Sequence, residues 1–201
     1  MTTSDKYTES HFLKRVAKHE LTVLRDDGLY RHLRFRAPET CIDGFDIVTW
    51  PGFLCYCGDM GDYVFQRADD MLSFFRRDKL RINPTYWSEK VVAQDRDGVK
   101  QFDPDIAQAK IREWIPEDAS DGLKVAIEEL IEEIPFDECG EETVRREVGG
   151  FSYCRAGESD WYFDQFCEAD LTEFTFRFIF CCYALAWGVR QYDARKAATA
   201  P

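Results

Sequence analysis

Residues 21–35 read Leu-Thr-Val-Leu-Arg-Asp-Asp-Gly-Leu-Tyr-Arg-His-Leu-Arg-Phe, and this stretch decides the fold. Its two alternating segments flank an Asp-Gly pair, which predicts a β-hairpin because glycine accepts the positive φ of a tight turn. In the second segment Leu33 and Phe35 fall on one side, whereas His32 and Arg34 fall on the other. The predicted sheet therefore has one apolar face and one polar, basic face.

Three further short strands follow in the first half of the chain. They are predicted at residues 45–50, 53–57 and 63–66, where short apolar segments are separated by glycine-containing turns. Together with the hairpin they predict an antiparallel meander of about four to five strands. A helix is predicted over residues 69–77, with acids in its first turn and bases in its last, as the helix dipole favours.

Two segments in the second half carry helical signals. Residues 121–134 are amphipathic, with apolar residues at three- and four-residue spacing and glutamates on the other side. Residues 174–189 are apolar almost all round, but they are shorter than the roughly 20 residues that a bilayer needs, and Arg177 interrupts them. We therefore expect a buried C-terminal helix rather than a membrane span.

The predicted organisation has four parts and belongs to the α+β class. A β-rich part, residues 1–102, packs on helices and is followed by an acidic helical and loop segment, residues 103–157. Residues 158–192 are expected to supply C-terminal helices that complete one core, beginning with a short helix at 160–171 that turns its aromatic residues inward. Residues 193–201 are expected to form a flexible tail.

The charge is concentrated in the middle of the chain. The protein has 38 acidic and 26 basic residues, a formal net charge of −12. Residues 1–102 contain 16 acids and 16 bases, residues 103–173 contain 21 acids and 6 bases, and residues 174–201 contain 1 acid and 4 bases. The overall balance argues against nucleic-acid binding, which needs clustered basic charge. The acidic block is a solvated helical face, a surface for a basic partner, or a mimic of a phosphate backbone.

The candidate partner-binding residues lie in this block. They are four glutamates at the end of the predicted helix and four acids that continue the run into a loop around Gly140: Glu128, Glu129, Glu132, Glu133, Asp137, Glu138, Glu141 and Glu142. The helical glutamates repel one another and oppose the helix dipole, so that a basic partner would relieve a local cost.

The sequence contains no motif that predicts a catalytic residue, a metal ligand set or a cofactor. It lacks the common phosphate-binding, dinucleotide-binding, zinc-protease and nucleophile-elbow motifs. The eight cysteines show no C-x-x-C spacing, and the absence of a secretory pattern predicts free thiols in a reducing cytosol. Cys55 and Cys57 are interpreted as buried small hydrophobes; metal ligation, or a nucleophile paired with His32, are the alternatives.

Several stretches of the sequence resemble a family of prophage and phage accessory proteins. They span both ends of the chain and leave residues 103–157 unmatched: His11-Phe-Leu-Lys-Arg15, Asp26-Asp-Gly-Leu-Tyr-Arg-His-Leu-Arg-Phe35, Trp50-Pro-Gly-Phe-Leu-Cys55, Tyr86-Trp-Ser-Glu-Lys90 and Cys181-Cys-Tyr-Ala-Leu-Ala-Trp-Gly188. The resemblance implies a host-takeover or counter-defence protein, similar in general character to anti-Gabija and anti-CRISPR inhibitors.

We therefore expect a phage-encoded, non-enzymatic protein of the host cytoplasm that inhibits a bacterial anti-phage defence complex by stoichiometric binding, blocking nucleic-acid access or activation. The expected partner is a defence complex with a basic surface. Neither direct nucleic-acid binding nor membrane binding is expected, and the sequence leaves open whether the chain forms homo-oligomers. Two alternatives remain: a nucleic-acid mimic, and a small enzyme or metal protein that acts on a signalling nucleotide.

Overall fold

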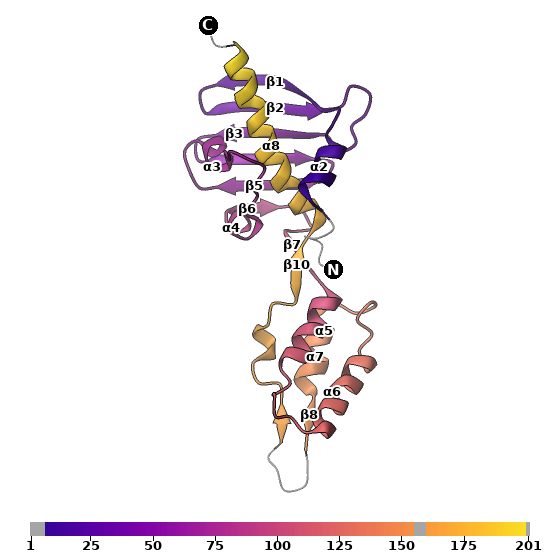
Figure 1. Ribbon diagram of the computed structural model, residues 1–201. Coiled ribbons are helices and arrows are strands. Elements are labelled where there is room, and N and C mark those ends of the chain that lie inside the picture. Colours follow the sequence, from indigo (N-terminus) through magenta and orange to yellow (C-terminus); the bar gives the residue numbers. More distant parts are fainter. Residues whose placement is uncertain (1–6, 155–159, 200–201) are drawn as a thin grey trace. The chain divides into compact units, whose positions relative to one another are not determined.

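The computed structural model describes residues 7–154 and 160–199. The chain forms two compact units: unit 1 comprises residues 1–100 and 174–201, and unit 2 comprises residues 101–173. Each unit has a hydrophobic core of its own. The predicted α+β class is confirmed, with an antiparallel meander sheet and a C-terminal helix packed on it (Figure 1).

The sheet of unit 1 has six strands in chain order, all pairs antiparallel. They are β1 (Glu20–Asp27), β2 (Tyr30–Arg36), β3 (Phe45–Trp50), β4 (Phe53–Gly58), β5 (Gly61–Gln66) and β6 (Val91–Gln94). The predicted hairpin turn is present, with Gly28 at a φ of 60°. The sequence did not predict β6, since two helices separate this four-residue strand from β5 in the chain.

Helices cover one face of this sheet, as Figure 1 shows for α8 and α2. The helices of unit 1 are α2 (Glu9–Arg15), α3 (Met71–Phe75), α4 (Pro84–Ser88) and α8 (Phe176–Thr199). Leu33 and Phe35 face them and are fully buried, as the alternation predicts. α8 lies very close to the strands at Gly188, where an added Cβ would lie 2.8 Å from Cδ1 of Ile47.

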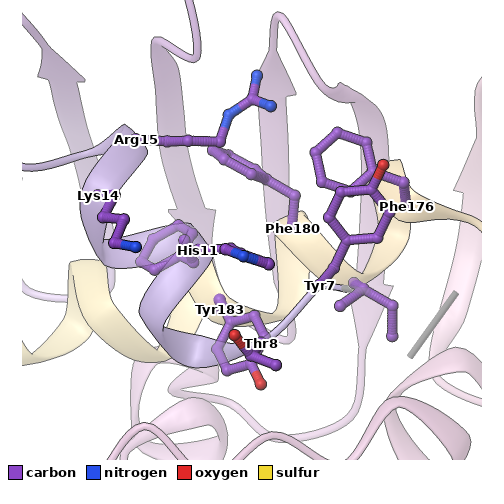
Figure 2. Close-up of a pocket in the computed structure, with 10 residues that line it drawn as sticks. Tyr7, Thr8, His11, Lys14, Arg15, Phe176, Phe180 and Tyr183 are labelled. Carbon is purple, nitrogen blue, oxygen red and sulfur yellow. The ribbon is translucent and has the colours of Figure 1, made fainter. Parts of the chain in front are cut away.

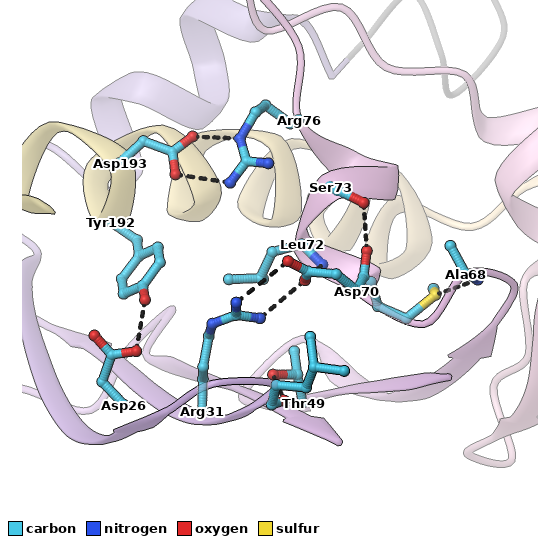
Figure 3. A network of polar contacts seen from close by, with 12 residues as sticks. Asp26, Arg31, Thr49, Ala68, Asp70, Leu72, Ser73, Arg76, Tyr192 and Asp193 are labelled. Atoms are coloured by element: carbon cyan, nitrogen blue, oxygen red, sulfur yellow. Dashed lines mark hydrogen bonds and ion pairs between the residues drawn. The ribbon is translucent and has the colours of Figure 1, made fainter. Parts of the chain in front are cut away.

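The expectation of a flexible tail over residues 193–201 is wrong for the part that the structure describes, because α8 runs through it. Polar contacts made by the last turns fix the helix to unit 1 (Figure 3). Arg76 donates two hydrogen bonds to Asp193, at 2.7 and 2.9 Å, and the hydroxyl of Tyr192 donates to Asp26 at 2.7 Å. Residues 200 and 201 lie outside the described residues.

Unit 2 consists of helices and two short strand pairs. Its helices are α5 (Pro104–Glu113), α6 (Asp121–Glu133), α7 (Glu141–Gly150) and the 3₁₀ helix η1 (Phe166–Glu168). Strand β8 (Ser152–Tyr153) pairs with β9 (Trp161–Tyr162), and β7 (Lys100–Phe102) pairs with β10 (Thr172–Phe174) where the chain enters and leaves the unit.

Three predictions for this part of the chain need correction. The expected loop around Gly140 is largely helix α7, which buries Val144 and Val148 in the core of unit 2. The expected helix at 160–171 is replaced by β9 and η1, because Gln165 adopts a left-handed conformation that interrupts a helix. Residues 158–192 do not complete one core, since their first part packs in unit 2 and α8 packs in unit 1.

Candidate functional site

The predicted acidic residues of α6 lie on its exposed side. Leu123, Ile127 and Ile131 recur at four-residue spacing and are buried in the core of unit 2. The glutamates between them consequently point to solvent, and all four of the predicted ones are exposed: Glu128, Glu129, Glu132 and Glu133. The amphipathic pattern of the sequence therefore gave the correct orientation of this helix.

The other predicted acids continue from α6 into the start of α7. Asp137 and Glu138 are exposed in the turn between the two helices, Glu142 is exposed in the first turn of α7, and Glu141 beside it is half-buried. The first turn of a helix favours negative charge, so this placement offsets part of the local repulsion. We call the eight residues on α6, the turn and α7 the acidic surface.

Two of the eight carboxylates are held by arginines of the same unit. Arg112 on α5 binds Glu128 with hydrogen bonds of 2.9 Å, and this contact lowers the pKa of the Glu128 carboxyl. Arg145 binds Glu141 and also donates to three backbone carbonyls around η1, including that of Ala169. These two pairs connect elements of unit 2 and have a structural role.

The remaining six carboxylates have no ion-pair partner among the described residues. They are Glu129, Glu132, Glu133, Asp137, Glu138 and Glu142. An exposed apolar side chain, Val125, lies on α6 one turn before Glu128 and Glu129, and 56% of its surface is accessible. Helical spacing places Val125 on the same side as these glutamates. The surface thus combines uncompensated negative charge with an apolar contact point.

A pocket of about 290 Å³ lies in unit 1 between α2 and α8 (Figure 2). Apolar side chains that include Phe176 and Phe180 line the pocket together with His11 and Lys14 of α2. The guanidinium of Arg15 sits 5.3 Å from the centre of the Phe176 ring and forms an ion pair with Asp43. The pocket can accept an apolar group. No sequence pattern indicates this pocket, because α2 and α8 lie at opposite ends of the chain.

The cysteine pair of β4 lies elsewhere than expected. Cys55 and Cys57 are half-buried on the sheet face that points away from α8, whereas the prediction placed them in the core. The thiol of Cys55 donates to the backbone carbonyl of Tyr56 at 3.8 Å, and the interaction between the two neighbouring thiols raises the pKa of Cys55 and lowers that of Cys57. His32 contacts Asp46 at 2.6 Å, so its ring is not oriented by a thiol.

The described part of the chain shows neither a metal centre nor a membrane span. In the part of the chain that the structure describes, no three histidine, cysteine or acidic side chains are grouped as metal ligands. The same part contains no helix with the length and apolar character needed to cross a membrane. No protein-family model matches the sequence, and comparisons with curated proteins and with solved structures find no significant similarity.

Proposed function

We propose that the protein is a phage-encoded inhibitor that binds a bacterial anti-phage defence complex stoichiometrically through the acidic surface of unit 2. One observation carries the proposal: six exposed carboxylates without ion-pair partners among the described residues lie in a segment with 21 acidic and 6 basic residues. Such a charge imbalance costs stability in the free protein, and a basic partner compensates it. The resemblance to phage accessory proteins supplies the biological context.

The chemistry of the acidic surface defines the partner. A surface that binds nucleic acid must present clustered lysine and arginine residues. Carboxylates on α6 and α7 are complementary to such a surface and would exclude the nucleic acid or prevent activation of the complex. Val125, exposed among the glutamates, supplies the apolar contact that the centre of a protein interface requires. Binding without turnover is therefore the mode of action that we propose, and the protein is not an enzyme.

A nucleic-acid mimic is the more specific form of the same proposal. If the carboxylates replace phosphates, the protein and DNA compete for one site on the partner, and the affinity falls steeply as salt rises. Affinity that hardly changes between about 50 and 200 mM salt would exclude mimicry and favour an interface dominated by apolar contacts.

The test compares two triple variants with equal changes of charge. E129K/E132K/E133K reverses three unpaired carboxylates of α6 and keeps the Glu128–Arg112 pair that connects α6 to α5. The control, E39K/D69K/D78K, reverses three exposed carboxylates of unit 1. Each protein is titrated into purified Gabija and CRISPR effector complexes, and inhibition of nuclease activity is measured. We expect complete inhibition near one equivalent for the wild type. The concentration needed for half-inhibition should rise at least about tenfold for the α6 variant and change less than about threefold for the control.

Three results would contradict the proposal. Equal inhibition by the wild type and the α6 variant would place the interface outside the acidic surface. Complete inhibition at a small fraction of one equivalent would indicate turnover and support the alternative of an enzyme acting on a signalling nucleotide. If the wild type bound no defence complex in an extended panel, defence complexes would be excluded as the class of partner.

A further inference from the structure

The face of the sheet opposite α8 carries three rows of side chains that the strand register defines. We call it the outer face. One row consists of His32, Val48, Cys55 and Val64, which lie directly opposite one another on β2, β3, β4 and β5. A second row contains Trp50 and Phe53, and a third contains Arg34, Asp46, Cys57 and Asp62. All three rows point away from Leu33 and Phe35, which face the core.

The centre of the outer face is apolar. Val48, Cys55 and Val64 are half-buried side by side, and the rings of Trp50 and Phe53 stack with their centres 5.4 Å apart. None of these five side chains belongs to the core of unit 1. An antiparallel sheet that faces water on one side normally carries polar residues there. Apolar side chains on this face therefore indicate a surface that another molecule covers.

The charged row has opposite signs at its two ends. At the β2 end, Asp46 accepts hydrogen bonds from Arg34 at 2.9 Å and contacts His32 at 2.6 Å, and Arg36 lies 3.9 Å away. Burial alone would raise the pKa of Asp46, but the hydrogen bonds from Arg34 and His32 lower it, so this carboxyl stays charged. Several basic groups share one carboxylate, which leaves this end positive.

At the β5 end the row is negative. Asp62 is exposed, and no basic side chain among the described residues forms an ion pair with it. The distance along the row from Arg34 to Asp62 covers three strand spacings, with Asp46 and Cys57 between them. Positive and negative ends are thus placed symmetrically about the line between β3 and β4.

We propose that two copies of the chain pack through their outer faces as a twofold dimer. A twofold axis parallel to the strands, between β3 and β4, exchanges β2 with β5 and β3 with β4. Arg34 of one copy then faces Asp62 of the second copy, and Val48 faces Cys55 of the second copy. The apolar rows meet each other, and each positive end meets a negative end. Such an isologous contact is self-complementary, as a closed dimer requires.

The dimensions of the sheet agree with this packing. Stacked sheets lie about 10 Å apart, a distance that an arginine and an aspartate side chain together can span. Six strands of about six residues give a face of roughly 30 by 20 Å, so two faces bury on the order of 1,200 Å² in total. This area is at the lower end for specific protein interfaces and predicts a dimer with a measurable dissociation constant.

The test measures the mass of the full chain in solution by sedimentation velocity, from about 1 to 100 μM. One chain has a mass of 23.5 kDa, and we expect the wild type to approach twice this mass as concentration rises. Val48→Lys places a charge at the centre of the outer face and should raise the dissociation constant at least about a hundredfold. Val125→Lys, the same change at an exposed valine of unit 2, should leave it within about twofold. Salt should weaken the wild-type dimer, because it screens the attraction between Arg34 and Asp62. Asp62→Lys replaces this attraction by repulsion, so that the variant dimer should be weaker and salt should strengthen it.

Folding and alternative occupants are controlled in the same experiment. The circular dichroism of the Val48→Lys variant should equal that of the wild type, because Val48 lies outside the core. Its Tm should equal that of the wild type at low concentration, where the wild type is monomeric, and should fall below it at high concentration, where the dimer stabilises the wild type. A wild type that stays monomeric at 100 μM overturns the proposal. So does an unchanged dimer in the Val48→Lys variant. If the monomeric wild type binds a fluorescent oligo(dT) strand and Trp50→Ala removes this binding, the outer face is a stacking surface for single-stranded nucleic acid and not a dimer interface.

Discussion

At the scale of single residues, Asp70 has two roles that the sequence showed only in part. Its carboxylate accepts a hydrogen bond from the backbone N–H of Leu72 and so caps α3. The helix predicted over residues 69–77 is shorter in the structure, because α3 spans only Met71–Phe75, so that the acids precede its first turn and the bases follow its last. The same carboxylate binds Arg31 of β2 with two hydrogen bonds, at 2.9 and 3.2 Å (Figure 3). This second contact joins residues 39 positions apart, and no local pattern encodes it.

Replacing Asp70 tests both roles together. Arg31 has 12% of its side chain exposed, so Asp70→Ala leaves a nearly buried guanidinium without its main partner and removes the helix cap. We expect the free energy of unfolding to fall by about 2–4 kcal/mol, as measured by urea denaturation with an unchanged m-value. Asp69→Ala, the matched change at the exposed neighbour, should cost less than about 0.5 kcal/mol. Similar losses for both variants would contradict the assigned roles.

At the scale of elements, periodicity predicted correctly which side chains are buried, whereas composition predicted the boundaries of several elements wrongly. The strands of the meander and α8 were recognisable, because alternation and a long apolar run report directly on the side that is buried. α7 was missed, since Gly149 and Gly150 together with its acidic flanks resemble a loop. The pattern of α7 is confined to Val144 and Val148, which is too short to outweigh these signals.

The contact between α8 and the sheet depends on the missing side chain of Gly188. An added Cβ would lie 2.8 Å from Ile47 and 3.1 Å from Phe35, whose ring has no space to withdraw in a fully buried core. Gly188→Leu should therefore push α8 from the strands and cost about 2–3 kcal/mol of unfolding free energy, measured by thermal and urea denaturation. Ala194→Leu, on the exposed side of the same helix, should change stability by less than about 0.5 kcal/mol. Equal stability of the two variants would show that α8 packs elsewhere.

At the scale of the whole molecule, the sequence predicted where charge accumulates but not how the chain divides. The acidic segment and the outward direction of its glutamates followed from composition and helical spacing. The outer face and the pocket between α2 and α8 did not, because both depend on residues that only the folded chain brings together. The structure has two cores instead of the predicted one, because the residues between α7 and β10 bury their aromatic side chains within unit 2.

Two separate cores predict that the two units unfold separately. Ile127 of α6 is fully buried in the core of unit 2, and Ile47 of β3 is fully buried in the core of unit 1. Either isoleucine replaced by alanine should cost about 2–4 kcal/mol in its own unit, through lost burial and the cavity left behind. Hydrogen exchange should then accelerate in α5, α6 and α7 for Ile127→Ala, and in the sheet strands for Ile47→Ala. If either variant accelerated hydrogen exchange in both units, the two units would unfold as one cooperative structure. The acidic surface would then not lie on an independently stable unit.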